Sequence, residues 1–198
     1  MGLAFGQAGA AESHLQNQSV KEGDVFVFYG WFRQIEQAAG IYRYVKDAPD
    51  LHLIFGWLQI ERRISVDNRQ EIPSWALDHP HCKRTKYSKI DSIYISSDKM
   101  ELRGAVNNKP GAGVFQRFDP ALCLTAPGML RSTWRLPRWF YPGEEKPALS
   151  YHKSFSRWQL GEDCVLLNSV GRGQEFVLDC QEYPEALNWL CSILRLQN

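Results

Sequence analysis

The sequence predicts an α+β protein whose centre is a small, mostly antiparallel β-barrel with a helix near each end of the chain. Two runs, residues 25–32 and 51–62, are rich in β-branched and aromatic residues and are too short for a membrane helix. Each run contains a glycine directly before a tryptophan, which suits two central strands that approach each other closely. Residues 184–196 begin at a proline and repeat apolar positions at helical spacing, which predicts an amphipathic helix.

The remaining elements follow from the same kinds of pattern. Residues 7–18 carry alanine and leucine at helical spacing without proline, so we expect a helix that leads to the Gly23-Asp24 turn. The expected strands share an apolar or alternating run between turn residues: 25–32, 41–45, 51–64, 92–97, 118–125, 164–168 and 175–179. The expected connections are a hairpin loop at 34–40, a short helical turn at 72–77 and a loop at 107–113.

Residues 1–198 are expected to form one domain. A composition of 44% hydrophobic and 23% charged residues is typical of a globular protein with a sizeable core. Barrel strands are expected at about 24–125 and 164–180. Residues 127–158 lose periodicity, are divided by prolines and are rich in tryptophan, tyrosine and arginine. Because disordered segments are poor in aromatics, we interpret 127–158 as an ordered, extended excursion from the barrel.

The cysteine pattern bears on the cellular compartment. The five cysteines are odd in number, widely spaced and without a C-x-x-C pair, which argues against a disulfide framework and a thiolate zinc site. The N-terminus lacks the features of a signal peptide, and no run has the length of a spanning helix. We therefore expect a cytoplasmic protein that has no membrane partner.

The charge pattern indicates an anionic partner. The formal net charge is only +1, yet residues 81–89 contain four cations and no acid, and residues 131–158 contain six cations and two acids. Two basic islands in an almost neutral chain indicate binding through particular surfaces, and nucleic acid is the candidate. Solvated loops are the alternative explanation for each island.

Several distinctive sequence motifs are spread over almost the whole chain and occur in a fixed order. They are FGQAGA (5–10), GDVFVFYGWFR (23–33), APDLHLIFGW (48–57), GAGVF (111–115), WRLPRWF (134–140), LSYH (149–152) and RGQEFVLD (172–179). With these words the chain resembles the nucleotide modification-associated domain 3 family. Longer members carry an additional N-terminal region that is not part of this sequence. The resemblance implies association with systems that make or handle modified bases.

The Gly-Asp turn before an early strand also resembles the PUA-like superfamily, whose ASCH, EVE and YTH branches include readers of modified bases. This resemblance implies a PUA-like barrel. A base can be read only after it leaves the duplex, and it is then held by stacking on aromatics and by hydrogen bonds to its edge. Residues expected to form such a base pocket are Tyr29, Trp31, Trp57 and Gln7. The alternative is that the three aromatic residues belong to the core.

A nucleic acid strand is expected to contact the places where cations alternate with aromatic rings. In residues 131–141 three arginines lie beside several rings, and the glycines flanking Arg172 allow the backbone to approach a phosphate. The expected nucleic-acid-binding residues are Arg131, Arg135, Arg138, Arg172, Lys83, Arg84, Trp134, Trp139, Tyr151 and His152. The alternative is a proline-rich loop whose arginines face water.

Four residues are candidates for catalysis. Glu175, Asp179 or Asp24 would supply a carboxylate that activates water or stabilises a sugar cation, and Lys153 would supply an amine nucleophile. The alternative for Asp24 is the ordinary role of aspartate in a turn, and that for the others is a turn or strand end. Residues 79–82, His-Pro-His-Cys, are too closely spaced for a familiar zinc site, so no metal is expected, and no small-molecule cofactor is expected either.

These observations lead to one hypothesis with two forms. We expect the protein to recognise a modified base in hypermodified phage DNA by base flipping. In the first form it is an enzyme that excises the base by hydrolysing the N-glycosidic bond, as a DNA glycosylase does, in antiviral defence. In the second it is a non-catalytic reader of modified bases in DNA or RNA. The sequence leaves the modification, the catalytic carboxylate and the oligomeric state open.

Overall fold

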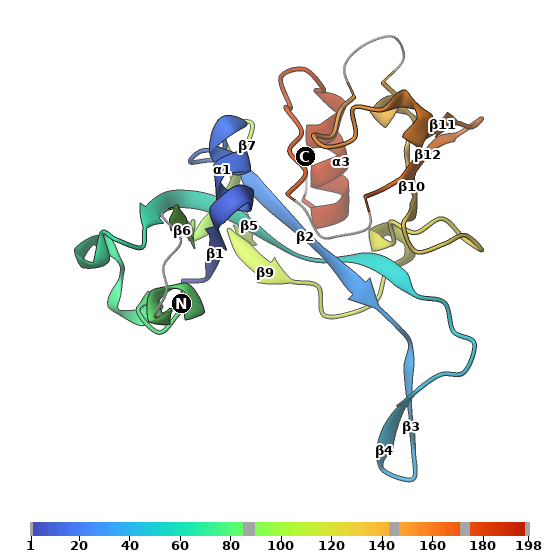
Figure 1. Cartoon of the computed structure of the whole chain (residues 1–198), viewed down its shortest axis with the longest axis horizontal. Coiled ribbons are helices and arrows are strands. Elements are labelled where there is room, and N and C mark those ends of the chain that lie inside the picture. The colour runs from blue at the N-terminus through green and yellow to red at the C-terminus, as the bar shows by residue number, and fades with distance from the viewer. Residues whose placement is uncertain (1, 85–89, 143–146, 171–174, 197–198) are drawn as a thin grey trace. The chain divides into compact units, whose positions relative to one another are not determined.

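The computed structural model describes residues 2–84, 90–142, 147–170 and 175–196 (Figure 1). It is mostly β, with antiparallel pairings and few helices, which agrees with the predicted α+β class at that level. The chain divides into two compact units. Unit 1 is drawn from residues 1–27, 56–115 and 195–198, and unit 2 from residues 28–55 and 116–194.

The largest sheet has the strand order β1-β6-β5-β2, and β9 pairs with β5 beside this path. The strands are β1 (Ala4–Ala8), β2 (Val25–Phe32), β5 (Leu51–Ser65), β6 (Asp91–Ser96) and β9 (Ala112–Val114). β6 pairs antiparallel with both β1 and β5, and β9 pairs antiparallel with β5. In the pairing of β1 with β6, Ala8 lies opposite Asp91. The boundary between the two units falls within β2 and within β5.

In unit 1 two helices and a hairpin accompany the sheet. α1 (Gly9–Asn17) follows β1 directly, and the Gly9 amide donates to the Ile90 carbonyl at 2.8 Å. α2 (Pro80–Lys83) has proline at its first turn, a position that needs no amide hydrogen. β7 (Lys99–Leu102) and β8 (Ala105–Pro110) form a hairpin. Short 3₁₀ turns at Arg69–Glu71 and Ser74–Ala76 connect β5 to α2.

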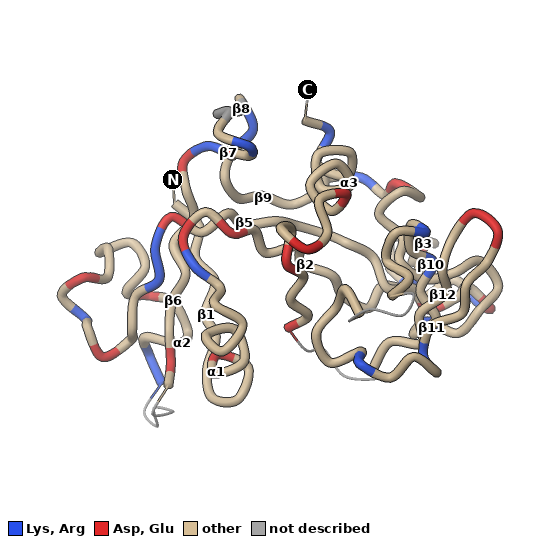
Figure 2. The backbone as a smooth tube through the Cα atoms, turned by 90° about the horizontal axis from the view of Figure 1, so that it is seen from above, with Lys and Arg blue, Asp and Glu red and all other residues tan. Residues whose placement is uncertain are grey.

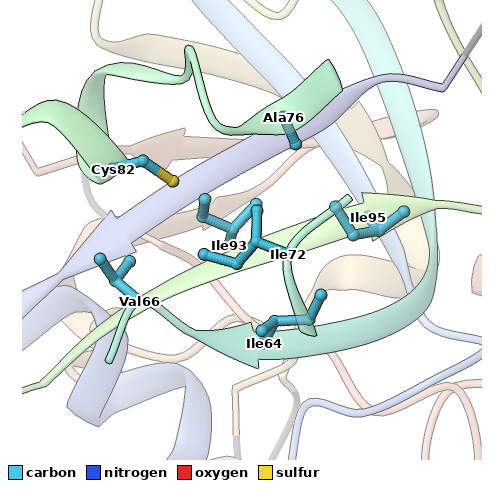
Figure 3. Packing of buried hydrophobic residues seen from close by; sticks show 7 residues of the cluster. All are labelled: Ile64, Val66, Ile72, Ala76, Cys82, Ile93 and Ile95. Carbon is cyan, nitrogen blue, oxygen red and sulfur yellow. The ribbon is translucent and has the colours of Figure 1, made fainter. Parts of the chain in front are cut away.

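The core of unit 1 lies between the sheet and the segment that leads to α2 (Figure 3). β5 and β6 contribute isoleucines, and the connecting segment and α2 contribute the other members. The buried cluster consists of Ile64, Val66, Ile72, Ala76, Cys82, Ile93 and Ile95. Because Cys82 belongs to this cluster, α2 is anchored on the core directly beside His81 and close to its N-cap residue His79.

Unit 2 contains a three-stranded sheet, a hairpin and the C-terminal helix. The sheet has the order β10 (Thr133–Pro137), β12 (Cys164–Asn168), β11 (Trp158–Leu160), and both pairings are antiparallel. β3 (Ile35–Ala38) and β4 (Ile41–Tyr44) pair as a hairpin that continues from β2 (Figure 1). α3 (Glu185–Leu194) buries positions at helical spacing, namely Ala186, Leu190, Ile193 and Leu194. Two more 3₁₀ turns lie at Arg138–Phe140 and Phe155–Arg157.

Several expected elements are confirmed, and others are wrong. Strands at 25–32, 51–64, 92–97 and 164–168, the turn at 72–77 and the C-terminal helix at 184–196 are present with small shifts of their ends. The predicted helix at 7–18 starts only at Gly9, because residues 4–8 pair with β6. The predicted loops at 34–40 and 107–113 contain β3, the end of β8 and β9, since backbone pairing overrides their weak strand pattern.

Two predicted strands do not form. Residues 118–125 contain the 3₁₀ turn Pro120–Leu122 and isolated bridges at Cys123 and Thr125. Residues 175–179 are irregular, and Val177 exchanges hydrogen bonds with Ser150 through its amide and its carbonyl. Within the predicted excursion at 127–158, residues 133–137 form β10, which pairs with β12. Whether these segments form strands depends on partners far away in the chain, which their own apolar pattern does not reveal.

The two predicted basic islands fall in different units, as far as they are described: residues 81–84 in unit 1 and residues 131–142 and 147–158 in unit 2. Figure 2 shows lysine and arginine together with acidic residues on the backbone of both units. Among the described helices, none is long and apolar enough to cross a membrane.

Candidate functional site

The predicted catalytic residues do not form one cluster within either unit. Asp24 is exposed in unit 1, and its Oδ2 accepts a hydrogen bond from the Lys21 amide at 2.8 Å, the usual role of aspartate in a turn. Asp179 is exposed in unit 2, and its Oδ1 accepts from the Gln181 amide at 2.8 Å. Lys153 is exposed and Glu175 is half-buried, both in unit 2. Their catalytic roles remain predictions.

The four predicted base-pocket residues divide between the units. Tyr29 and Trp31 lie on β2 in unit 2, whereas Trp57 and Gln7 lie in unit 1. Trp57 is buried, and its indole donates to the Pro110 carbonyl at 3.0 Å. It is therefore a core residue, which was the alternative to a place in the base pocket. Gln7 is half-buried on β1, and its Oε1 accepts from the Ala8 amide. Trp31 is different, because 63% of it is exposed.

An aromatic cluster forms the inside of unit 2. Tyr29 and Phe176 stack with ring centroids 6.0 Å apart, and both meet Trp134 edge-on. The Trp134 indole donates to Nδ1 of His52 at 2.9 Å. Burial, and to a smaller extent the charge of Arg131, lowers the pKa of His52. Tyr29 therefore belongs to a packed cluster with β10.

His152 is enclosed at the edge of the same cluster. Its ring lies 4.5 Å from that of Phe176, and its Nε2 accepts from the Val170 amide at 3.3 Å. Burial lowers the pKa of His152, which keeps the acceptor nitrogen unprotonated. Trp134 and His152 are both buried, so their predicted contacts with nucleic acid require these side chains to become exposed.

The other predicted nucleic-acid-binding residues have varied surroundings. Arg138 is exposed and donates to the carbonyls of Gly161 and Glu162, and Arg135 is exposed on β10. Trp139 is half-buried and stacks on Phe140 with 3.8 Å between the ring centroids. Tyr151 is exposed, and Lys83 pairs with Asp78 at 2.8 Å. Arg172 lies outside the described residues.

The exposed indole of Trp31 is the centre of a first candidate site, the Trp31 platform, formed by Trp31, Arg33, Asp50 and Arg131. The Arg131 guanidinium lies over the Trp31 ring, 4.0 Å from its centroid, which is a cation–π contact. Arg33 pairs with Asp50 at 2.9 Å and also lies over the ring of Tyr44 at 5.2 Å. An exposed ring is thus held beside two guanidinium groups.

The electrostatics of the platform keep Asp50 ionised. A hydrogen bond from Trp31 is the largest cause that lowers the pKa of Asp50, and the charges of Arg33 and Arg131 lower it further. The indole is therefore held on its ring by Arg131, and its N–H interacts with the Asp50 carboxylate. A ring held in this way is ordered before a ligand arrives, which reduces the entropy lost on binding.

Arg131 has a hydrogen-bonding group without an acceptor. Its Nε is buried and has no hydrogen-bond partner among the described residues. A buried donor without a partner costs free energy, so an acceptor from a ligand would be favoured here. Phosphate and the oxygen atoms of a base edge are acceptors of this kind.

The second candidate site, the histidine site, lies in unit 1 and comprises His79, His81, Arg84 and Asp91. Nδ1 of His81 lies 2.5 Å from Oδ1 of Asp91, which is the first residue of β6. Nη2 of Arg84 lies 3.2 Å from Nε2 of His81. His79 stands at the start of α2, and its Nδ1 accepts from the His81 amide at 3.2 Å. α2 and the beginning of β6 therefore hold the two halves of an Asp–His pair.

Burial decides the electrostatics of this site. The Asp91 side chain is almost fully buried, and Oδ2 has no hydrogen-bond partner among the described residues. Its nearest cation in the described chain is Arg84, whose Nη1 lies 3.8 Å away. Burial lowers the pKa of His79, and the neighbouring His81 lowers it further. The pair consequently sits beside a second imidazole that favours its neutral form.

Gly6 on β1 closes the histidine site from one side. A methyl group added to Gly6 would lie 2.5 Å from Cδ2 of His81 and 2.6 Å from Cε1 of His79. We expect Gly6→Ala to lower the free energy of unfolding by about 1–3 kcal/mol, because overpacking forces neighbours out of position. Urea unfolding measures the loss, and the NMR shifts of the His81 ring protons report the displacement. In a His79→Ala/His81→Ala background the same change should cost less; an equal cost would contradict this packing.

Sequence reasoning recognised only part of these sites. The His-Pro-His-Cys sequence at 79–82 was considered only as a possible metal site. The hydrogen bond between His81 and Asp91, ten residues later in the chain, was not predicted. Among the described residues, no three histidine, cysteine or acidic side chains are grouped so that they could hold a metal ion. Asp50 and Arg33 were also missed as neighbours of Trp31, although both lie in words that carry the resemblance.

A match to a known protein family covers nearly the whole chain. The sequence model described as nucleotide modification associated domain 3 matches residues 2–179. No curated protein and no solved structure matches the chain. The matched range includes the Trp31 platform and the histidine site.

Proposed function

The chain belongs to the nucleotide modification associated domain 3 family, and on that premise we propose that it recognises a modified nucleobase in DNA by stacking the base on Trp31. The family ties the chain to modified nucleotides, and the platform supplies a suitable surface. Flipped or single-stranded bases are held by stacking on aromatic rings next to cations that meet the backbone. The PUA-like architecture and base flipping are parts of this proposal.

The observation that carries the proposal is the combination of exposure and order at Trp31. A large exposed indole is normally left free, yet the Arg131 guanidinium lies over this one at 4.0 Å from the ring centroid, and its N–H interacts with the ionised Asp50. The buried Nε of Arg131 still lacks an acceptor among the described residues. A base stacked on the indole would use the exposed ring, and a phosphate at Arg131 would give its guanidinium an acceptor.

Excision of the recognised base is the enzymatic form of the proposal, and non-catalytic reading of DNA or RNA is its alternative. Excision hydrolyses the N-glycosidic bond and leaves an abasic site, which alkali converts into a strand break. Incubation with oligonucleotides that contain modified cytosine, followed by alkaline cleavage, separates the two forms. Intact strands together with a clear mobility shift would support the reader.

We expect Trp31→Ala to weaken binding of single-stranded DNA that contains 5-hydroxymethylcytosine by about 10-fold or more, because a base–aromatic stack contributes about 1–3 kcal/mol. Fluorescence anisotropy at fixed salt measures the affinity. Phe118→Ala is the matched control, since Phe118 is 65% exposed in the same unit but is not part of the platform. Equal affinities of wild type and Trp31→Ala would contradict the proposal.

A further inference from the structure

We propose that one face of the β3–β4 hairpin binds single-stranded DNA beside the recognised base, so that neighbouring bases stack on Tyr44 and Tyr42. This inference rests on the proposed function and deepens it, because it names the substrate as an unpaired strand rather than a duplex. The hairpin and the Trp31 platform both lie in unit 2. We call the face concerned the aromatic face; it consists of Ile35, Gln37, Tyr42 and Tyr44.

The strand register makes the two faces of the hairpin different. Ile35 lies opposite Tyr44. Gln37 lies opposite Tyr42 in the next pair on the same face, because side chains alternate between the faces along a strand. The other face carries the remaining pairs, Glu36 with Arg43 and Ala38 with Ile41. The acidic side chain of the two strands, Glu36, therefore lies away from the aromatic face and pairs with Arg43 at 2.7 Å.

Folding leaves the aromatic face in contact with solvent. Ile35 is 54% exposed, Tyr42 is 68% exposed and Tyr44 is 65% exposed. A hairpin of two strands has little stability of its own, and apolar side chains that gather on an exposed surface commonly mark a binding site. The two tyrosine rings are thus available to a ligand without any rearrangement of the chain.

Arg33 joins the aromatic face to the Trp31 platform. Its guanidinium lies 5.2 Å from the centroid of the Tyr44 ring, and its Nε lies 2.9 Å from Oδ1 of Asp50. Asp50 in turn interacts with the N–H of Trp31. A strand that places one base on Trp31 can therefore continue past Arg33 onto Tyr44. Rings beside guanidinium groups suit this ligand, because its bases stack on rings and its phosphates bind guanidinium.

The spacing of the two tyrosines favours an unpaired strand. Tyr42 and Tyr44 are two residues apart on β4, which corresponds to about 7 Å at the usual rise of a β-strand. Successive bases of a duplex are only about 3.4 Å apart and cover one another. Neighbouring bases can stack on both rings only in an extended strand whose bases have separated. Single-stranded DNA meets this condition.

We expect removal of the flanking bases to weaken binding by about 10-fold or more, the loss expected for one base–aromatic stack. The first probe is a single-stranded oligonucleotide with 5-hydroxymethylcytosine at its centre. In the second probe the nucleotides on both sides of the modified one are abasic. The two probes have the same phosphates, so their difference in affinity reports stacking of the flanking bases. Fluorescence anisotropy at fixed salt measures both affinities.

Tyr42→Ala should weaken binding of the first probe by about 10-fold and leave the affinity for the second unchanged. Tyr42→Phe should bind as the wild type does, because it keeps the ring. Ile41→Ala is the matched control, since Ile41 is 71% exposed on the other face of the same hairpin. Equal affinities of Tyr42→Ala and wild type for the first probe would overturn the inference. Tighter binding of the matching duplex than of the single strand would also overturn it.

The response to Trp31→Ala separates this inference from the proposed function. If Trp31→Ala weakens binding but the wild type binds the two probes equally, the aromatic face is overturned and the recognition function stands. If Trp31→Ala binds as the wild type does while Tyr42→Ala binds the first probe more weakly, recognition on Trp31 fails and strand binding on the aromatic face stands. Sedimentation tests the alternative occupant, a second copy of the chain. A wild-type dimer that Tyr42→Ala dissociates would overturn the inference.

Discussion

Ile93→Ala is expected to lower the free energy of unfolding by about 4 kcal/mol, the largest effect of any single change considered in this protein. Ile93 on β6 is completely buried and belongs to the core cluster of unit 1 (Figure 3). Removing a buried isoleucine to alanine costs about 2–5 kcal/mol, because the transfer free energy is lost and a cavity remains. For a chain of this length the unfolding temperature should fall by about 10 °C, measurable by calorimetry.

The cavity should also affect the histidine site, since Cys82 of the same cluster lies next to His81 on α2. Ile93→Val keeps most of the volume and should cost about 1 kcal/mol. Ile41→Ala removes the same groups from an exposed residue on β4 and should leave stability almost unchanged. A loss at Ile93→Ala no greater than that at Ile41→Ala would show that the cluster is not a core.

Glu12→Ala is expected to lower the free energy of unfolding by about 3 kcal/mol, because it removes a buried acceptor shared by three donors. Glu12 on α1 is fully buried, and its Oε2 accepts from the Tyr94 hydroxyl at 2.7 Å. Its Oε1 accepts from Gln16 at 2.9 Å and from Arg63 at 3.2 Å. The variant leaves the buried hydroxyl of Tyr94 without this acceptor, and urea unfolding at neutral pH measures the loss.

Tyr94→Phe tests the same network from the other side and should cost less, about 1 kcal/mol, since Glu12 keeps two donors. Burial, together with the hydrogen bond to Glu12 and its charge, raises the pKa of Tyr94 above the unfolded value of about 10. The neutral phenol therefore contributes stability below pH 10, and this contribution decreases as the pH rises above 10. Tyr94→Phe should lose less stability between pH 8 and pH 11 than the wild type; an equal loss would refute the network.

Local pattern was sufficient for elements whose signal lies in adjacent residues. The runs at 25–32 and 51–64 and the helix at 184–196 were predicted because β-branched, aromatic and amphipathic patterns act over a few residues. β1 and β10 were missed because each becomes a strand only by pairing with a distant one, β6 and β12. Their own residues do not alternate clearly enough to show it.

The candidate sites follow the same division. Trp31 and Arg131 were each identified as ligand-binding residues from their type, but their contact at 4.0 Å joins positions one hundred residues apart. His81 was considered only as a possible metal ligand. Nothing in residues 79–82 shows that Asp91, the first residue of β6, accepts a hydrogen bond from its ring. Trp57 and Trp134 looked equivalent to Trp31 in the sequence, and burial alone distinguishes them.

By itself the sequence determined the class of the protein, the main strands and the C-terminal helix, and membership in a family linked to nucleotide modification. It could do so because composition, periodicity and ordered words are properties of residues close together in the chain. Only the tertiary structure decided which aromatics are exposed, which carboxylate faces His81 and which donor lacks an acceptor. These properties are set by side chains brought together from distant segments, since burial and hydrogen bonding depend on what surrounds a residue in space.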